Sequence, residues 1–376
     1  MNSKFLTALI IAIVVWWCIP HSVKVAAKRA LTAPVSSAPS DRPGAAQAKS
    51  AAPLHTRQFQ VTAGGVSADG SVLVGTFLPL TGNMHAYRWT ESGGAQDLGT
   101  IGEIGAEPTG VSANGSVIVG RFTGAKFVPH AFRWTQSGGA QDLGTRILAS
   151  GVSADGSVIV GDVIVADNVH HIYRWTRSGG VQDLGTMGGI TAHANAVSAD
   201  GSVIVGNFGY DAPHAYRWTQ SGGAQDLGIM GGIAANAIGV SADGSVIVGG
   251  FMDTHGDPHT FRWTQSGGAQ ELGSMGGPKG SWAIGVSSDG SVIVGNIVEA
   301  DRAEHPYRWT QSGGVQDLGT MGGISAHANA ASADGSVIVG NFTGAKFVQH
   351  AFRWTQSGGA QDLGANFGQG AAAMAR

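Results

Sequence analysis

The sequence predicts an all-β fold, a seven-bladed β-propeller of four-stranded blades that spans residues 56–364. The first observation is an Asp-Gly turn motif that begins at residues 69, 155, 200, 243, 289 and 334, with Asn114 in place of the aspartate once. The second is an Arg-Trp-Thr motif whose tryptophan stands at positions 89, 134, 175, 218, 263, 309 and 354. Both series give seven units spaced 41 to 46 residues apart, a period typical of propeller blades.

Each unit contains four short segments with strand character. In the fourth unit they are residues 193–198, 202–208, 214–219 and 224–228. Ala-Asp-Gly separates the first two and Ser-Gly-Gly the last two, and both favour tight turns because Gly and Asp tolerate positive φ. No unit has helical periodicity. Each unit is therefore predicted to be a sheet of four consecutive strands.

The second segment of the units, Ser-Val-Ile-Val-Gly, is apolar on both faces rather than alternating. A strand of this kind is covered on both sides. Sheets stacked face to face around an axis supply that cover and hide most strand edges. A β-solenoid is the alternative, but it would need two turns per unit and would leave ends to cap.

The Ser-Gly-Gly turn predicts how the third strand pairs with the fourth. If Thr219 faces Ala224 across a four-residue loop, Arg217 faces Asp226. Directly opposed unlike charges favour a register by about 0.2–1 kcal/mol each. We therefore expect one structural pair in each blade: Arg88–Asp97, Arg133–Asp142, Arg174–Asp183, Arg217–Asp226, Arg262–Glu271, Arg308–Asp317 and Arg353–Asp362.

The units His-Ala-Phe-Arg-Trp (130–134 and 350–354), together with Val-Ser-Ala-Asp-Gly-Ser-Val-Ile-Val-Gly, resemble the HAF repeat of extracellular bacterial repeat proteins. The resemblance covers residues 56–364. It implies a secreted or surface location and says little about activity.

Composition and motifs exclude several classes of function. The formal net charge is −3 and no basic run occurs, so nucleic acid is not an expected partner. The sequence has no nucleophile-elbow motif and no phosphate-binding loop, and Cys18 is its only cysteine. We therefore predict no catalytic residue, no cofactor and no metal ligand. The chain after Cys18 cannot form disulfides, so its stability must come from burial.

One histidine precedes the aromatic residue of the third strand in every unit. Equivalent positions on adjacent blades lie about 10 Å apart, whereas Zn²⁺ needs its ligands at about 2 Å. We expect these rings to be structural, each with a nitrogen hydrogen-bonded to neighbouring backbone. They are His85, His130, His171, His214, His259, His305 and His350.

Acids that fall outside the repeat pattern are the candidates for a pair of catalytic carboxylates. They are scattered over different units, and we expect them to be solvated loop charges. They are Glu103, Glu107, Asp162, Asp211, Asp253, Asp257, Glu299, Asp301 and Glu304.

The units differ most between the second and third strands and between the fourth strand and the next unit. In an up-and-down blade both connections lie at one end, so one end is variable and the other constant. Variable loops on a rigid scaffold commonly bind partners, although neutral drift is the alternative. The position five residues before the serine of each Asp-Gly turn varies most, and we expect its side chains to face a ligand, with Trp282 as an exposed anchor. The residues at this position in the seven units are Thr62, Glu107, Leu148, His193, Asn236, Trp282 and His327.

Residues 1–29 are predicted to be a signal peptide or a membrane anchor. Lys4 precedes an apolar run at residues 5–20, and Val25-Ala26-Ala27 offers a cleavage site. The run is short for a span of about 20 residues, so export with cleavage is favoured over anchoring. Residues 30–55 are an Ala/Pro/Ser-rich linker that we expect to be disordered, and residues 365–376 are expected to be a flexible tail.

These observations predict an exported, monomeric and non-catalytic protein at the cell surface or outside the cell. Its partner is expected to be a glycan or a protein, bound by the variable loops. The alternatives are a propeller enzyme that acts on polysaccharide, and a periplasmic structural module tethered to the inner membrane through an uncleaved run at residues 5–20.

Overall fold

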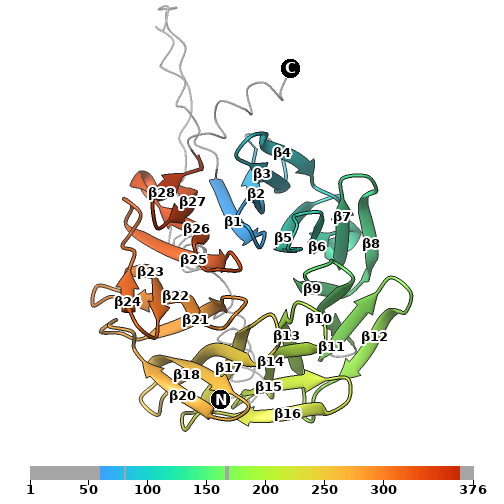
Figure 1. The fold of residues 1–376 in the computed structure, drawn as a ribbon. Coiled ribbons are helices and arrows are strands. Elements are labelled where there is room, and N and C mark those ends of the chain that lie inside the picture. The colour runs from blue at the N-terminus through green and yellow to red at the C-terminus, as the bar shows by residue number, and fades with distance from the viewer. Residues whose placement is uncertain (1–59, 80–81, 166–168, 365–376) are drawn as a thin grey trace, which may run out of the picture. The chain divides into compact units, whose positions relative to one another are not determined.

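The computed structural model describes residues 60–364, except for residues 80–81 and 166–168. The described residues form seven four-stranded antiparallel sheets arranged in a ring (Figure 1). Each sheet consists of four consecutive strands. The predicted seven-bladed β-propeller is therefore confirmed, and we number the blades 1 to 7 in chain order.

The first strand of every blade lies nearest the axis and contacts the first strands of both neighbouring blades. These strands are β1 (Gln60–Val66), β5 (Gly105–Val111), β9 (Ile147–Val152), β13 (Ala192–Val197), β17 (Ala234–Val240), β21 (Ser281–Val286) and β25 (Ser325–Ala331). The second strands follow outward: β2 (Val72–Leu78), β6 (Val117–Thr123), β10 (Val158–Ile164), β14 (Val203–Phe208), β18 (Val246–Met252), β22 (Val292–Val298) and β26 (Val337–Thr343).

The third strands are β3 (His85–Thr90), β7 (Pro129–Thr135), β11 (His170–Thr176), β15 (His214–Thr219), β19 (Pro258–Thr264), β23 (Glu304–Thr310) and β27 (Gln349–Thr355). The outermost strands are β4 (Gly94–Gly99), β8 (Gly139–Thr145), β12 (Gly180–Gly185), β16 (Gly223–Gly228), β20 (Gly268–Gly273), β24 (Gly314–Asp317) and β28 (Gly359–Asp362). Two short 3-10 turns, Ala125–Phe127 and Ala345–Phe347, lie between second and third strands. In blade 4 each strand begins and ends within one residue of its predicted limits.

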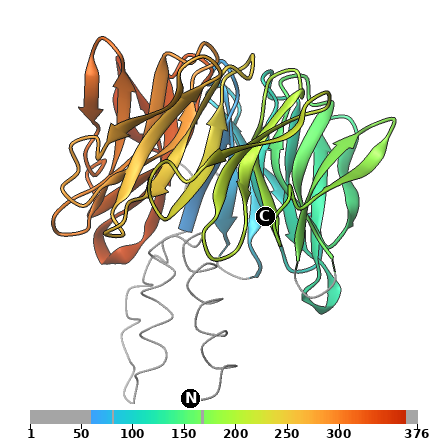
Figure 2. The same cartoon turned by 90° about the horizontal axis from the view of Figure 1, so that it is seen from below.

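The second strands are buried on both faces, as their unbroken apolar sequence predicts. In blade 4, Val203 and Val205 pack with Ile247 of blade 5, whereas Ile204 packs with Val158 and Val160 of blade 3. Alternate side chains of one strand therefore fill the cores on either side of its sheet. Figure 2 gives the side view, in which each sheet stands against its neighbours.

The Asp-Gly turns join the first and second strands, and with the Ser-Gly-Gly turns they form the constant end of the propeller. In blade 4 the Ser198 hydroxyl donates to Asp200 Oδ1 at 2.7 Å and accepts from the Val203 amide at 2.9 Å. Gly201 has a φ of +75°, and an added Cβ would collide with Val158 of the preceding blade. The turn thus needs glycine both for its conformation and for the close packing of blades.

A circle of backbone hydrogen bonds closes the ring at the constant end. The residue after the serine of each Asp-Gly turn donates its amide to the equivalent carbonyl of the next blade, and the last blade donates back to the first. The participants in order are Ala68, Ala113, Ala154, Ala199, Ala242, Ser288 and Ala333, with N–O distances of 2.6 to 3.0 Å.

The seam between blades 7 and 1 is further closed by side chains rather than by a shared strand. The Ala63 amide donates to Asn341 Oδ1 at 2.8 Å, and Asn329 Nδ2 donates to the Ala63 carbonyl at 2.7 Å. Val61 and Val337 belong to one apolar cluster that spans the seam. The first and last blades therefore close the propeller although each is built only from its own four consecutive strands.

The predicted register between the third and fourth strands is wrong by one residue. Thr219 pairs with Gly223, so Arg217 faces Gln225, and Asp226 faces Tyr216. The connecting loop has three residues rather than four, because Gly223 takes a left-handed φ of +65° and already pairs. A one-residue slip moves a side chain to the other face of the sheet.

The same slip separates the arginine and carboxylate of the predicted pairs in the other blades. There the arginine pairs with a glutamine, and the acid pairs with an aromatic residue. This correction applies to Arg88–Asp97, Arg133–Asp142, Arg174–Asp183, Arg262–Glu271, Arg308–Asp317 and Arg353–Asp362.

The carboxylates of the fourth strands bind the repeated histidines instead. In blade 4, His214 Nδ1 lies 2.9 Å from Asp226 Oδ2, and the other blades have the same contact at 2.9 to 3.0 Å. The predicted structural role of the histidines stands, but their partner is a carboxylate rather than backbone. The bulge after the paired aromatic residue brings the acid beside the histidine ring.

Candidate functional site

The predicted variable positions share one register position on the innermost strands. Each pairs with one second-strand residue, as His193 does with Asn207. They therefore stand on strands rather than on loops, which corrects the sequence expectation. All seven side chains are half-buried: Thr62, Glu107, Leu148, His193, Asn236, Trp282 and His327.

Most of these side chains contact neighbours in the protein. Arg121 binds Glu107 in a two-pronged ion pair with a shortest distance of 2.8 Å. The centroid of the Trp282 ring lies 6.0 Å from the centroid of the His327 ring. Asn236 accepts a hydrogen bond of 2.7 Å from Asn195. The expected exposed anchor, Trp282, is therefore a half-buried side chain packed across a blade junction.

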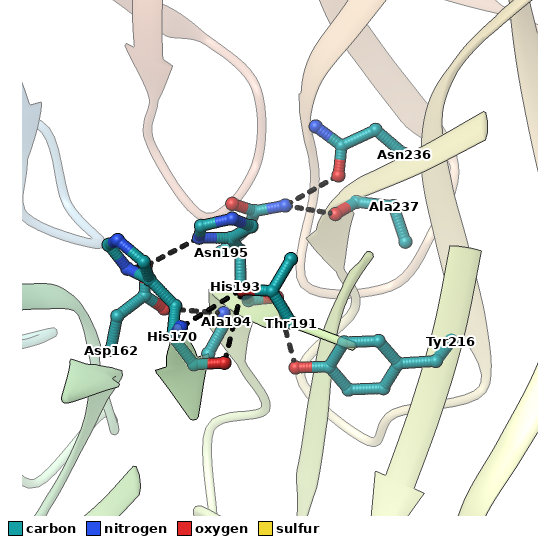
Figure 3. A network of polar contacts seen from close by, with 9 residues as sticks. All are labelled: Asp162, His170, Thr191, His193, Ala194, Asn195, Tyr216, Asn236 and Ala237. Atoms are coloured by element: carbon teal, nitrogen blue, oxygen red, sulfur yellow. Dashed lines mark hydrogen bonds and ion pairs between the residues drawn. The ribbon is translucent and has the colours of Figure 1, made fainter. Parts of the chain in front are cut away.

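A polar cluster that includes one of these positions lies between blades 3 and 4 (Figure 3). Asp162 on β10 approaches His193 on β13, with Oδ2 2.7 Å from the ring Nδ1. His170, the first residue of β11, places its Nδ1 3.4 Å from the same oxygen. The two imidazole rings are 4.8 Å apart between centroids. Three strands from two blades thus bring one carboxylate and two imidazoles together.

Asp162 also binds the backbone of the next blade. Its Oδ1 accepts a hydrogen bond of 3.0 Å from the Ala194 amide. The side chain is only 10% exposed. Burial raises the pKa of Asp162, but the two histidines and the Ala194 amide stabilise its charged form, and the net result is a pKa below its usual range. The carboxyl group is therefore ionised at neutral pH.

The backbone around the cluster is fixed by Thr191. The His170 amide donates to Thr191 Oγ1 at 3.0 Å, and the same hydroxyl donates to the His170 carbonyl at 3.2 Å. On the other side, the Tyr216 hydroxyl donates to the His193 carbonyl at 3.1 Å. Figure 3 shows Thr191 and Tyr216 on either side of the His193 backbone. Hydrogen bonds therefore restrain the backbone of both histidines.

The junction of blades 6 and 7 repeats this arrangement with different side chains. Asn296 replaces the aspartate and accepts a hydrogen bond of 2.8 Å from the Ala328 amide. Glu304 stands where His170 stands, and its Oε2 lies 2.6 Å from Nδ1 of His327. Ser325 makes the contacts of Thr191, with the Glu304 amide donating to its hydroxyl at 2.9 Å. This junction has one imidazole where the other has two.

Sequence reasoning found part of this cluster and missed its composition. Asp162 and Glu304 were both noted as acids outside the repeat, and His193 and His327 as variable positions. His170 was missed, although it doubles the repeated histidine His171 in the sequence. That doubling, together with an off-pattern acid, was the available signal.

Large apolar side chains are exposed mainly at the variable end, formed by the loops after the second and fourth strands. Of the nine such residues in the described part of the chain, seven lie there: Leu78, Met84, Phe127, Ile190, Ile233, Ile324 and Phe347. The other two, Val181 and Val315, lie near the start of fourth strands. The two ends of the propeller therefore differ in the apolar surface that they offer.

The phenylalanines of the variable end have an unusual backbone. Phe127 is 79% exposed and Phe347 68% exposed, and both have a φ of +61°. A bulky residue in the left-handed region is strained, by about 1–3 kcal/mol. Backbone strain of this kind is found most often at functional sites.

The predicted signal or anchor, the linker and the tail lie outside the described residues. Within the described part of the chain, none of the helices has the length and apolar character needed to cross a membrane.

Solved structures share the fold. The propeller domain of the trilobed protease from Pyrococcus furiosus, described as having an open velcro topology, matches with a TM-score of 0.62 and 11% identity, over 82% of this chain and 98% of that one. Pyrococcus horikoshii acylaminoacyl peptidase matches with a TM-score of 0.58 and 11% identity, over 82% and 53%. A puromycin hydrolase matches with a TM-score of 0.54 and 16% identity, over 83% and 54%.

The chain thus spans about half the length of the two enzymes and nearly all of the isolated propeller domain. At such identities the similarity shows the fold alone. No known family profile matches the sequence, and no curated protein matches it.

Proposed function

We propose that this protein is an exported, non-catalytic propeller of the HAF repeat type that binds a partner through its variable end. The observation that carries the proposal is the gathering of seven exposed large apolar side chains at that end. Exposed apolar surface on a rigid framework is typical of interaction sites. The constant end, with its uniform turns and its circle of hydrogen bonds, supplies the framework.

A protein partner fits the chemistry of this end better than a glycan. Isoleucine and phenylalanine side chains bury apolar area and offer no polar atoms for sugar hydroxyl groups. Ile190 is 72% exposed and Phe127 is 79% exposed, so each can insert into a pocket on a partner surface. The strained Phe127 and Phe347 loops hold their side chains outward, which lowers the entropy cost of binding.

Export and an extracellular location rest on the sequence. The apolar run at residues 5–20 and the resemblance to the HAF repeat support them. Mass spectrometry of the mature protein tests this part of the proposal. A chain that begins near residue 28 supports export with cleavage, and an intact Met1 favours the tethered module.

The binding proposal is tested by screening the full chain against arrays of surface proteins and glycans. A loop variant carries Phe127→Ser, Ile190→Thr and Phe347→Ser, and a matched control carries Val181→Thr and Val315→Thr, which are exposed apolar residues away from the variable end. We expect the loop variant to bind an array partner at least about tenfold more weakly, because each buried anchor contributes about 1–2 kcal/mol.

The control should bind as the wild type does. Equal binding by the two variants would contradict the assignment of the variable end. Release of products from a panel of polysaccharides would instead favour the propeller enzyme.

A further inference from the structure

We propose that the junction of blades 3 and 4 binds one divalent transition-metal ion, represented by Zn²⁺, through Asp162, His170 and His193. One ligand atom from each residue lies within 4.8 Å of the others. The proposal reverses the sequence expectation that the chain carries no metal ligand. It is independent of partner binding by the variable loops, so either proposal can fail without the other.

One distance between ligand atoms matches a tetrahedral site, and a second is shorter than such a site requires. With ligand atoms about 2.0–2.1 Å from a zinc ion, neighbouring ligand atoms are about 3.4 Å apart. His170 Nδ1 is already 3.4 Å from Asp162 Oδ2. His193 Nδ1 is 2.7 Å from that oxygen, as a direct hydrogen bond. Metal binding would widen this second distance by about 0.7 Å, which a small rotation of the half-exposed His193 ring supplies.

His170 gives an independent reason to expect a ligand. Its Nδ1 atom is buried, and its contact with Asp162 Oδ2, at 3.4 Å, is longer than a normal hydrogen bond. Buried polar atoms are nearly always paired, and each exception calls for an explanation. A metal ion between this nitrogen and the carboxylate oxygen would satisfy both atoms.

The surroundings orient the ligands as protein metal sites require. Hydrogen bonds to first ligands fix their geometry and tune the affinity for the metal. The Ala194 amide binds Asp162 Oδ1 and leaves Oδ2 directed toward the histidines. Thr191 fixes the backbone of His170 through both its amide and its carbonyl. The carboxylate and one histidine are therefore positioned before any ion binds.

Comparison among blades separates the metal-binding role of Asp162 from its structural role. Asn296 and Asn341 occupy its position in blades 6 and 7, and each accepts the same backbone amide of the following blade at 2.8 Å. A neutral amide thus suffices for that contact. The negative charge of Asp162 occurs where two histidines are also present, which is the combination a divalent cation needs.

The other group of possible ligands does not make a comparable site. Glu299, His305 and Asp317 approach one another near the end of blade 6. His305 Nδ1 is already bound to Asp317 at 3.0 Å, in the contact that every blade repeats. The contact between His305 and Asp317 is therefore part of the repeated scaffold, and Glu299 only lies close to it.

The proposed site keeps a position open to solvent. The His193 side chain is 35% exposed and the His170 side chain is 22% exposed, whereas Asp162 is 10% exposed. Three protein ligands leave the fourth tetrahedral position for water or a small anion. Asp162 would thus hold the ion from the interior of the protein, and solvent would reach the ion next to the more exposed His193.

The test titrates the full chain, without an affinity tag and after removal of metals with a chelator, with Zn²⁺ by calorimetry. We expect one Zn²⁺ per chain. Asp162→Asn and His170→Gln should each weaken binding by more than about 100-fold, since loss of a ligand exceeds the effect of losing a second-sphere partner. Co²⁺ bound to the wild type should show the visible absorption of a tetrahedral site, and Asp162→Asn should abolish it.

Glu304→Gln is the matched control at the equivalent junction and should bind Zn²⁺ as the wild type does. Circular dichroism checks that the variants fold. His170→Gln keeps the test decisive if Asp162→Asn does not fold, because the contact of His170 Nδ1 with Asp162, at 3.4 Å, is too long to contribute much to stability. No binding by the wild type, unchanged binding by His170→Gln, or several ions per chain held by the repeated His–Asp pairs would each overturn the proposal.

Discussion

Two blade junctions have the same backbone arrangement, that of blades 3 and 4 and that of blades 6 and 7. They differ in which strand carries the negatively charged side chain. In the first, the carboxylate is buried on the second strand as Asp162. In the second, it is Glu304 on the third strand, with a neutral Asn296 in the buried position. One histidine of the innermost strand, His193 or His327, binds the carboxylate in both.

This difference shows how a repeat protein can acquire a specific site without altering its scaffold. At both junctions the buried side chain accepts a hydrogen bond from one backbone amide of the next blade, and either aspartate or asparagine can make this contact. The remaining position on the third strand is free to vary. A histidine there completes a set of ligands, whereas a glutamate there forms a simple ion pair.

The largest effect is expected from converting one junction into the other. The double variant Asn296→Asp with Glu304→His gives blades 6 and 7 the ligand set of blades 3 and 4, next to the existing His327. We expect it to bind two Zn²⁺ per chain where the wild type binds one, measured by calorimetry and by metal analysis. Adding Asp162→Asn to the double variant should restore one ion per chain.

If the double variant folds and still binds a single ion, the comparison between the junctions fails. Features other than the three ligands would then control the first site.

The architecture around these junctions was predictable from sequence because it depends on local, repeated signals. The Asp-Gly turns, the Arg-Trp-Thr motif and the doubly apolar second strand predicted seven sheets and their order. The register of the outer strand was not predictable, because one left-handed glycine, Gly223, shortens the loop by a residue. Spacing alone does not reveal which glycine of a pair takes that conformation.

The site was less predictable because it assembles across blades. Asp162 and His170 are eight residues apart in sequence, and His193 lies in the next unit. His193 reaches the other two residues through the stacking of two sheets, which no local pattern records. The sequence marked Asp162 as unusual, but the pairing of β11 with β10 brings His170 to it and the packing of β13 against β10 brings His193.

A smaller effect is expected when the buried side chain of each junction is removed, measured by urea unfolding with a chelator present. Asn296→Ala should lower the free energy of unfolding by about 2 kcal/mol, because the Ala328 amide loses its buried partner. Asp162→Ala should lower it by about 3 kcal/mol, because hydrogen bonds to a charged group are stronger. Equal losses would mean that the charge of Asp162 adds nothing to stability without a metal ion.

The smallest effect is expected for Glu304→Gln at the junction of blades 6 and 7. Glu304 is 22% exposed and its histidine partner is 35% exposed, so solvent weakens their attraction. A glutamine oxygen can still accept the hydrogen bond from His327 Nδ1. We therefore expect a loss of unfolding free energy of no more than about 0.5 kcal/mol, measured by the same urea unfolding. A loss as large as that of Asn296→Ala would show that the ion pair, rather than the buried amide contact, holds this junction together, and the two junctions would then depend on charge alike.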